Sequence, residues 1–247
     1  MLRGYYSAAS GMLVGQRNLN VIGQNIVNSQ TAGYRAQRVV QSTFDQELVT
    51  RYEGGVYTKI GDASQTNLVE TVDTIVNEAS IYETENPYDM AILSDGYFNV
   101  NGAEGRTFMT RNGSFSLDDE GYLQLEGVGR VQGENGDIYV GGNNFTMDTL
   151  GNIYDVNGQF SGRLLITRPA QDSQILKFQN GLFITDNVEQ VDNAEVINYG
   201  YERSNVDMND EYTRLMEAQA AFKACSTALS TINQLNMKSA SQIASIS

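Results

Sequence analysis

The two ends of the chain share a charge pattern that its middle lacks. Residues 1–44 contain no Asp or Glu but four arginines, and residues 218–247 contain no acid but Lys223 and Lys238. All 30 acidic residues therefore fall in residues 45–217, with only 10 of the 16 Lys and Arg. An acidic, self-repelling middle between two acid-free arms is typical of a dispersed body whose arms pack against something. The arms are the first candidates for a functional surface.

The first arm carries a helical pattern. Its apolar positions alternate spacings of four and three, which predicts one helix over residues 1–26. At about 1.5 Å per residue this helix would reach about 39 Å, and so narrow a stripe favours a partner helix. Turn-forming residues at 28–33 end it, since Gly33 can adopt a positive φ. The stripe consists of Met1, Tyr5, Ala8, Met12, Gly15, Leu19, Ile22 and Ile26.

The last arm repeats the pattern from residue 208 to residue 235. Asn205 or Asp207 can cap this helix, because a short side-chain oxygen accepts from the N–H groups of the first turn. The two stripes have two interpretations. They form a helical pair that covers the body of the same chain, or they contact neighbouring copies, which the matched charge of the arms favours. The second stripe consists of Met208, Tyr212, Leu215, Ala218, Phe222, Cys225, Leu229, Ile232 and Leu235.

The middle reads as β structure with an internal repeat. Residues 115–123 and 145–153 share the order apolar-x-apolar-Asp-x-x-Gly-x-apolar. Alternating apolar residues suit a half-buried strand, Asp can hydrogen-bond the turn backbone, and Gly supplies the unusual φ of a hairpin. The sequence therefore predicts a largely antiparallel β domain.

The predicted fold class is α+β, with long N- and C-terminal helices packed together and a central antiparallel β-rich domain. Residues 1–44 and 204–247 would form a discontinuous helical assembly domain. Residues 45–84 would connect it to a β-rich body at residues 85–203.

Composition removes several function classes. The chain has no histidine and one cysteine, which excludes Ser-His-Asp and Cys-His catalysis and His-ligated zinc. A net charge of −14 argues against nucleic-acid binding, and no apolar run approaches membrane-spanning length. Three apparent sites also fail. Residues 118–121 lack the ligand spacing of a calcium loop, residues 127–133 lack dinucleotide-loop spacing, and Asp89 and Asp95 form no diagnostic acid pair. We expect no enzyme, no catalytic or metal-binding residue and no cofactor.

Several motifs carry a resemblance to a known family. Residues 25–35 (Asn-Ile-Val-Asn-Ser-Gln-Thr-Ala-Gly-Tyr-Arg) resemble the N-terminal signature of bacterial flagellar rod and hook proteins. Their C-terminal signature resembles residues 204–208 (Ser-Asn-Val-Asp-Met) with residues 218–222 (Ala-Gln-Ala-Ala-Phe). Between them, residues 86–92, 95–98 and 110–115 are similar to the body of the basal-body rod subfamily, of both distal-rod and proximal-rod types.

The resemblance implies a mechanical function. Such proteins polymerise through their terminal helices into a hollow helical axle that transmits torque to the hook. The implied partners are further copies, other rod and hook proteins and the type III export apparatus. The implied location is the flagellar basal body outside the cytoplasmic membrane, in the periplasm or cell-wall zone. The predicted assembly residues are Met1, Tyr5, Met12, Leu19, Ile22, Asn25, Ile26, Asn28, Gly33, Tyr34, Asn205, Val206, Tyr212, Leu215, Phe222, Cys225, Leu229, Ile232 and Leu235.

Two alternatives stay open. A hook or hook-junction axial protein shares the terminal signatures, although hook proteins usually carry extra domains. A β-rich surface adhesin or glycan-binding module belongs to a different class, and it predicts dispensable arms.

Overall fold

The structure is a computed structural model that divides into two compact units. It describes residues 2–53, 56–75, 77, 79–102, 105–142, 145–155, 157–170, 173, 175–178 and 181–244. The first unit comprises Met1–Val27, Ala36–Ile75 and Asp207–Ser247, and the second comprises Asn28–Arg35 and Val76–Val206. The predicted α+β fold, with two terminal helices and a central antiparallel β region, is confirmed. Met1, a predicted assembly residue, lies outside the described residues.

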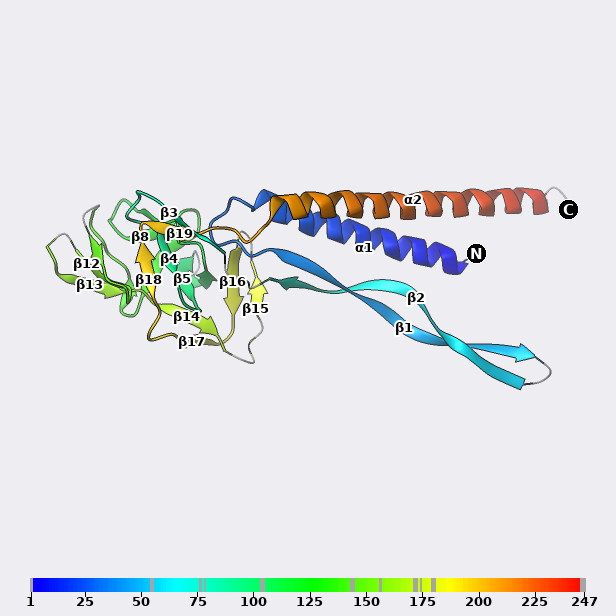
Figure 1. Cartoon of the computed structure of the whole chain (residues 1–247), viewed down its shortest axis with the longest axis horizontal. Coiled ribbons are helices and arrows are strands. Elements are labelled where there is room, and N and C mark those ends of the chain that lie inside the picture. Colours follow the sequence, from blue (N-terminus) through cyan, green and yellow to red (C-terminus); the bar gives the residue numbers. More distant parts are fainter. Residues whose placement is uncertain are drawn as a thin grey trace. The chain divides into compact units, whose positions relative to one another are not determined.

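The first unit contains both long helices and one long hairpin. Helix α1 (Leu2–Val27) lies against helix α2 (Met208–Ala244), as Figure 1 shows. Strand β1 (Gln37–Glu53) pairs antiparallel with strand β2 (Val56–Thr74) along their whole length. This hairpin occupies most of the predicted connecting segment and begins inside the predicted helical arm. The boundaries of the two units therefore differ from the predicted domain boundaries.

Helix α1 ends where the sequence predicted. Its last residue is Val27, and the turn after it brings Gly33 to a φ of 66°. A Cβ atom on Gly33 would lie 2.2 Å from the carbonyl carbon of Arg111. Glycine is therefore required here for both its backbone conformation and its lack of a side chain.

Helix α2 begins at a side-chain cap. The Asp207 carboxylate accepts hydrogen bonds from the backbone N–H groups of Asn209 at 2.8 Å and Asp210 at 3.4 Å. Asp207, of the two predicted candidates, is therefore the N-cap. Asn205 instead donates from Nδ2 to the carbonyl of Asn77 at 3.1 Å. The helix then runs past its predicted end at residue 235.

The second unit is built from short strands whose described pairings are all antiparallel. Its largest sheet has the order β15-β16-β6-β5-β9-β8-β7, with β10 on β9, β14 on β5, and β17 on β14. The strands of this sheet are β5 (Tyr97–Gly102), β6 (Thr107–Thr110), β7 (Ser116–Leu117), β8 (Leu123–Leu125), β9 (Gly129–Gly133), β10 (Gly136–Asp137), β14 (Ile166–Pro169), β15 (Ile175–Lys177), β16 (Leu182–Thr185) and β17 (Val188–Gln190).

Smaller sheets complete the second unit. Three strands pair in the order β11-β12-β13, and two further pairs join β18 to β4 and β19 to β3. A single apolar core includes Phe98, Val100, Leu123, Val131 and Ile153, each fully buried. The remaining strands are β3 (Ile81–Glu83), β4 (Met90–Ile92), β11 (Thr146–Met147), β12 (Asn152–Tyr154), β13 (Phe160–Arg163), β18 (Val196–Asn198) and β19 (Gly200–Glu202).

The predicted hairpin repeat is present, with one more copy than the sequence analysis identified. Asp118, Asp148 and Asp155 each accept from the N–H groups two and four residues later, at 2.8 to 3.0 Å. The glycine three residues after each Asp has a φ between 74° and 88°. These carboxylates are thus engaged by the turn backbone, which also lowers the pKa of Asp155. The third copy was missed because Asn152 stands where the repeat has an apolar residue, three positions before the Asp.

Candidate assembly interface

The two helices meet in an antiparallel seam that glycines of α1 make narrow. Toward its N-terminus α1 faces positions progressively nearer the C-terminus of α2. A Cβ atom on Gly11 would lie only 2.9 Å from the Cys225 Sγ, so a larger residue would require the Cys225 side chain or the helix itself to shift. Glycine lowers helix propensity by about 1 kcal/mol relative to Ala, which the close approach of α2 offsets. The close pairs are Gly4 with Ile232, Gly11 with Cys225 and Gly15 with Phe222.

Most of the predicted helical residues lie on this seam. On α1 they are partly or fully buried, and on α2 they are half-buried among otherwise exposed neighbours. Tyr212 and Leu235 are 49% and 52% exposed and lie outside the seam. Glu211 is fully buried and takes the inward position that the apolar pattern assigned to Tyr212. The seam residues that were predicted are Tyr5, Met12, Leu19, Ile22, Ile26, Leu215, Phe222, Cys225, Leu229 and Ile232.

A second buried face of α1 was missed. Val14, Val21 and Asn25 are buried, although the predicted stripe excluded them from the apolar face. Helix α1 contacts β1 and β2 as well as α2, so it has two partners where one was expected. The signal was present, because these residues recur at spacings of seven and four and include two valines.

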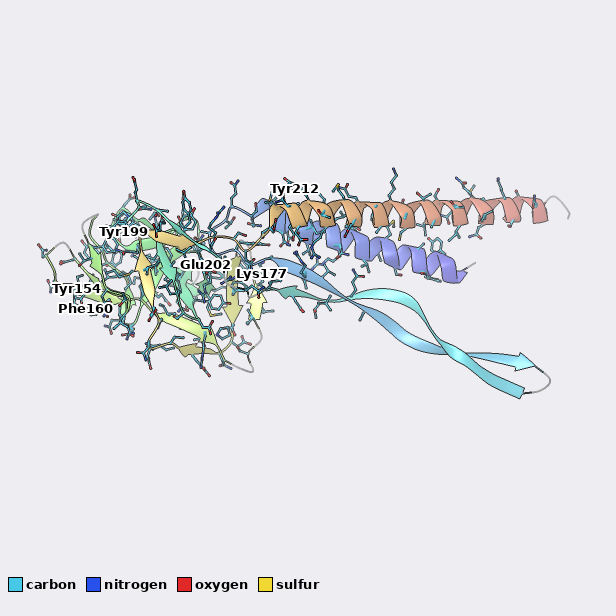
Figure 2. All side chains as sticks on the ribbon, viewed as in Figure 1. Tyr154, Phe160, Lys177, Tyr199, Glu202 and Tyr212 are labelled. Carbon is cyan, nitrogen blue, oxygen red and sulfur yellow. The ribbon has the colours of Figure 1, made fainter. Side chains whose placement is uncertain are left out.

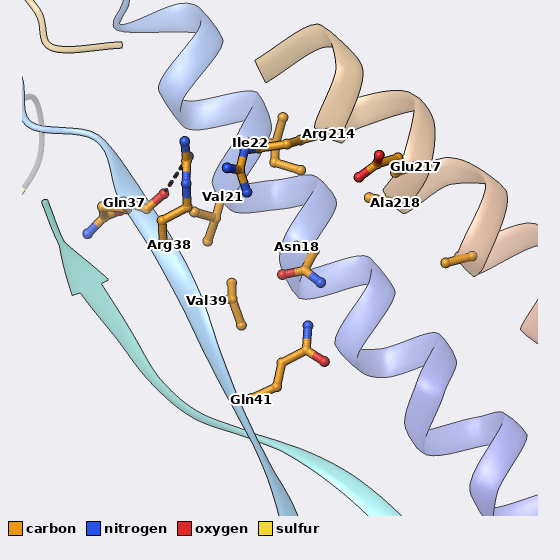
Figure 3. A pocket seen from close by; sticks show the side chains of 11 residues that line it. Asn18, Val21, Ile22, Gln37, Arg38, Val39, Gln41, Arg214, Glu217 and Ala218 are labelled. Atoms are coloured by element: carbon orange, nitrogen blue, oxygen red, sulfur yellow. Dashed lines mark hydrogen bonds between the residues drawn. The ribbon is translucent and has the colours of Figure 1, made fainter. Parts of the chain in front are cut away.

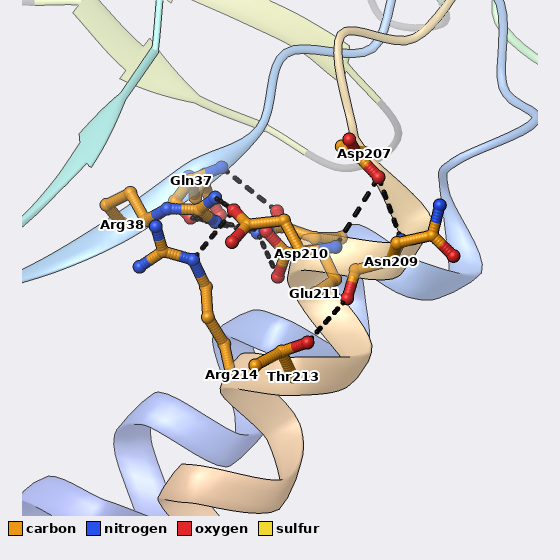
Figure 4. A network of polar contacts seen from close by, with 9 residues as sticks. Gln37, Arg38, Asp207, Asn209, Asp210, Glu211, Thr213 and Arg214 are labelled. Carbon is orange, nitrogen blue, oxygen red and sulfur yellow. Dashed lines mark hydrogen bonds and ion pairs between the residues drawn. The ribbon is translucent and has the colours of Figure 1, made fainter.

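A buried polar anchor joins the three chain segments of the first unit (Figure 4). The Asn25 amide group exchanges two hydrogen bonds of 2.9 Å with the backbone of Gln37, donating to its carbonyl and accepting from its N–H. Asn25 Nδ2 also lies 3.3 Å from Glu211 Oε2, and Glu211 forms an ion pair with Arg38. The end of α1, the start of β1 and the start of α2 are therefore held by one network. Asn25 was a predicted site residue, whereas Glu211 and Arg38 were not.

The rim of this anchor carries exposed charges. Asp210 accepts from Arg214 Nε at 2.8 Å and pairs with Arg38 at 3.2 Å. The hydrogen bond from Arg214 lowers the pKa of the Asp210 carboxyl. Because both partners are about half exposed, this pair contributes little beyond fixing the first turn of α2. Acids in that turn also favour the positive end of the helix dipole.

The other predicted site residues belong to the second unit and have internal contacts there. Gly33 and Tyr34 are buried, and the Gly33 N–H donates to the carbonyl of Glu202 at 2.7 Å. Asn28 accepts from the Thr31 N–H at 3.1 Å in the turn after α1, and the Asn205 N–H donates to Tyr34 at 3.3 Å. Their part in contacts between copies stays a prediction, as does that of half-buried Val206.

A buried charge cluster fixes this region and was not predicted. The Glu202 carboxylate lies between two guanidinium groups, 2.6 Å from Arg35 Nη2 and 3.5 Å from Arg111 Nη1. All three residues are less than a tenth exposed, so the cluster is a buried group with two cations and one anion. Burial lowers the pKa of Arg111, and the charge of Glu202 opposes that shift. The Ala79 N–H adds a 3.0 Å hydrogen bond to Glu202 Oε1.

Lys177 packs against Tyr34 and the backbone of Arg35, next to this cluster. Lys177 Nζ lies 4.2 Å from the ring centroid of Tyr34 and donates to the carbonyl of Arg35 at 3.2 Å. Figure 2 labels Lys177 and Glu202, both in the second unit. Burial lowers the pKa of Lys177 to about 8. The cation–π contact and the carbonyl therefore only partly replace water around the ammonium group.

Lys177 is expected to make stability depend on pH between about 8 and its ordinary value of 10.5. In that window the unfolded chain binds more protons than the folded one, so the free energy of unfolding rises with pH. The free energy of unfolding, measured with denaturant, should increase for the wild type relative to Lys177→Met as the pH rises. Lys223→Met, at an exposed position, should show no such trend. A wild-type to Lys177→Met difference independent of pH would contradict the assignment.

The described residues contain no group of three or more His, Cys, Asp or Glu able to hold a metal ion. Within the same part of the chain, no helix has the length and apolar character needed to cross a membrane. The contacts described above form packing surfaces and buried polar anchors.

Comparisons with known proteins agree with this geometry. The family model described as flagellar hook protein FlgE/F/G D1 domain matches residues 91–188, and that of the flagellar basal body rod FlgEFG protein C-terminal region matches residues 201–243. The flagellar basal-body rod protein FlgG of Bacillus subtilis is 30% identical over 95% of this chain and 97% of its own length. FlhO, a flagellar hook-basal body complex protein of the same organism, is 26% identical over the full length of both. The chain therefore belongs to the family of bacterial flagellar rod and hook proteins, which are structural axial components.

Proposed function

We propose that this chain is a structural subunit of the flagellar basal-body rod, polymerising through its terminal helices into a hollow helical axle that transmits torque to the hook. The observation that carries the proposal is the exposed apolar surface on the two helices of the first unit. Its helices bury their shared seam and one face of α1 against β1 and β2, while apolar side chains elsewhere on both helices stay exposed. Such faces gain when a neighbouring copy covers them. The exposed residues include Tyr6, Leu13, Tyr212, Met216, Leu235 and Met237.

The proposed partners are further copies, other rod and hook proteins and the type III export apparatus. The proposed location is the basal body outside the cytoplasmic membrane, in the periplasm or cell-wall zone. We assign no catalytic activity and no cofactor, because the matched family consists of structural flagellar components.

A hook protein is the second candidate. The flagellar hook protein FlgE of Treponema pallidum is 33% identical, but the match spans 54% of this chain and 30% of the hook protein. The rod protein FlgG matches nearly end to end, which favours the rod.

Deleting the gene in the source bacterium tests the proposal. We expect that the cells no longer swim and that their basal bodies lack a complete rod. An axle with a missing section cannot transmit torque. A plasmid copy of the gene should restore both. Complete rods without hooks would favour the hook candidate, and normal swimming with lost surface attachment would favour an adhesin.

A further inference from the structure

The first unit has a groove near the start of α2. It has a volume of about 320 Å³ and lies between α1, β1 and α2 (Figure 3). Its apolar lining comes from all three elements, and charged side chains stand beside it. The lining includes Val21, Ile22, Val39, Ala218 and Ala221, with Arg38, Arg214 and Glu217 among the charged groups.

The charges around the groove are unequally satisfied. Arg38 pairs with Asp210 and Glu211, and Arg214 pairs with Asp210. Glu217 is exposed and forms no ion pair in the part of the chain that the structure describes, although its charge helps to raise the pKa of neighbouring Arg214. The groove therefore offers one exposed carboxylate that lacks an ion pair, beside an apolar lining, which suits an apolar side chain accompanied by a cation.

The far end of α2 has that chemistry. The last described contact of its seam with an α1 glycine is at Ile232, and the helix continues to Ala244. Leu235 and Lys238 lie three positions apart and share one face of this extension, and both are exposed. No acid occurs from residue 218 onward, so nothing on the extension competes for the lysine.

We propose that the extension of one copy, residues 235–242, docks in the groove of the next copy, with Leu235 on the apolar lining and Lys238 beside Glu217. This inference rests on the proposed function and adds a specific contact to it. Groove and extension lie about 20 residues apart on the same helix, so successive copies would be displaced by about 30 Å along α2. A contact between two different surfaces does not close on itself and generates an open helical array. It therefore fits an axle better than a symmetric dimer.

A charge exchange between the two surfaces tests the contact. Purified Glu217→Lys and Lys238→Glu variants are each expected to raise the protein concentration needed for polymerisation by about tenfold, because each places like charges together. An equimolar mixture of the two is expected to polymerise like the wild type, because every contact then pairs opposite charges in alternating copies. The Glu217→Lys/Lys238→Glu double variant should also recover. Sedimentation and electron microscopy measure both results.

Controls separate this inference from the proposed function. Lys223→Glu reverses an exposed charge outside both surfaces and should polymerise like the wild type. Circular dichroism of each monomer checks that α2 stays helical. A wild type that never polymerises would contradict the proposed function itself. A polymerising wild type with unaffected single variants, or with variants that neither mixing nor combination restores, would overturn the docking contact alone.

Discussion

Glu202→Gln is expected to destabilise the second unit by about 3 to 5 kcal/mol. The change keeps the size of the side chain but removes the one negative charge that lies between Arg35 and Arg111. Two guanidinium groups would then remain buried without a counter-charge, and burial makes that far more costly than at the surface. Chemical denaturation of the purified protein measures the loss.

The matched control is Glu189→Gln. Glu189 also pairs with an arginine, Arg168, at 2.8 Å, but both side chains are about half exposed. We expect a loss of about 0 to 1 kcal/mol there. Equal effects of the two substitutions would mean that the buried cluster does not hold the second unit together.

Phe222→Asp is expected to abolish polymerisation while the second unit still folds. Phe222 lies on Gly15 in the seam of the first unit, where an unpaired carboxylate costs several kcal/mol. The second unit contains no part of this helix. Sedimentation of the purified variant, swimming of bacteria that carry it, and a retained unfolding transition measure the three parts of the expectation.

Ala224→Asp is the matched control for the seam, since it adds the same charge to the same helix at an exposed position. Its monomer should keep the paired helices, as measured by thermal unfolding followed at a helix signal. Normal swimming of bacteria that carry Phe222→Asp would show that the terminal helices are not the assembly surface. Unfolding of the second unit in the Phe222→Asp variant would show that the seam belongs to a core shared by both units.

Periodicity predicted the helices because a 3.6-residue repeat depends only on neighbouring residues. The same reasoning assigned Tyr212 to the seam and missed Glu211, because it ranks positions by apolarity and a buried acid needs a partner that is distant in sequence. That partner, Arg38, follows α1 by only a short turn. The anchor was visible only once both helices were placed.

The hairpin at residues 37–74 and the cluster around Glu202 were missed for a related reason. Strands β1 and β2 pair through backbone hydrogen bonds, which need no particular side chains. The segment is polar and shows no apolar alternation, so its pairing could not be predicted from the sequence pattern. Arg35 stood inside the N-terminal signature and Arg111 inside a body motif, but no local pattern indicates that they share one carboxylate. By contrast, the Asp-x-x-Gly turns were predicted correctly because the turn chemistry lies within five residues.

The anchor between Asn25 and Glu211 joins residues 186 positions apart. Closing so long a loop is slow, and it can happen only after α2 has been synthesised. Until then only one helix of the seam is present, so the surface that α1 and α2 form together is incomplete. A chain arranged in this way has a built-in delay, because a partly synthesised molecule that lacks α2 cannot yet complete its first unit.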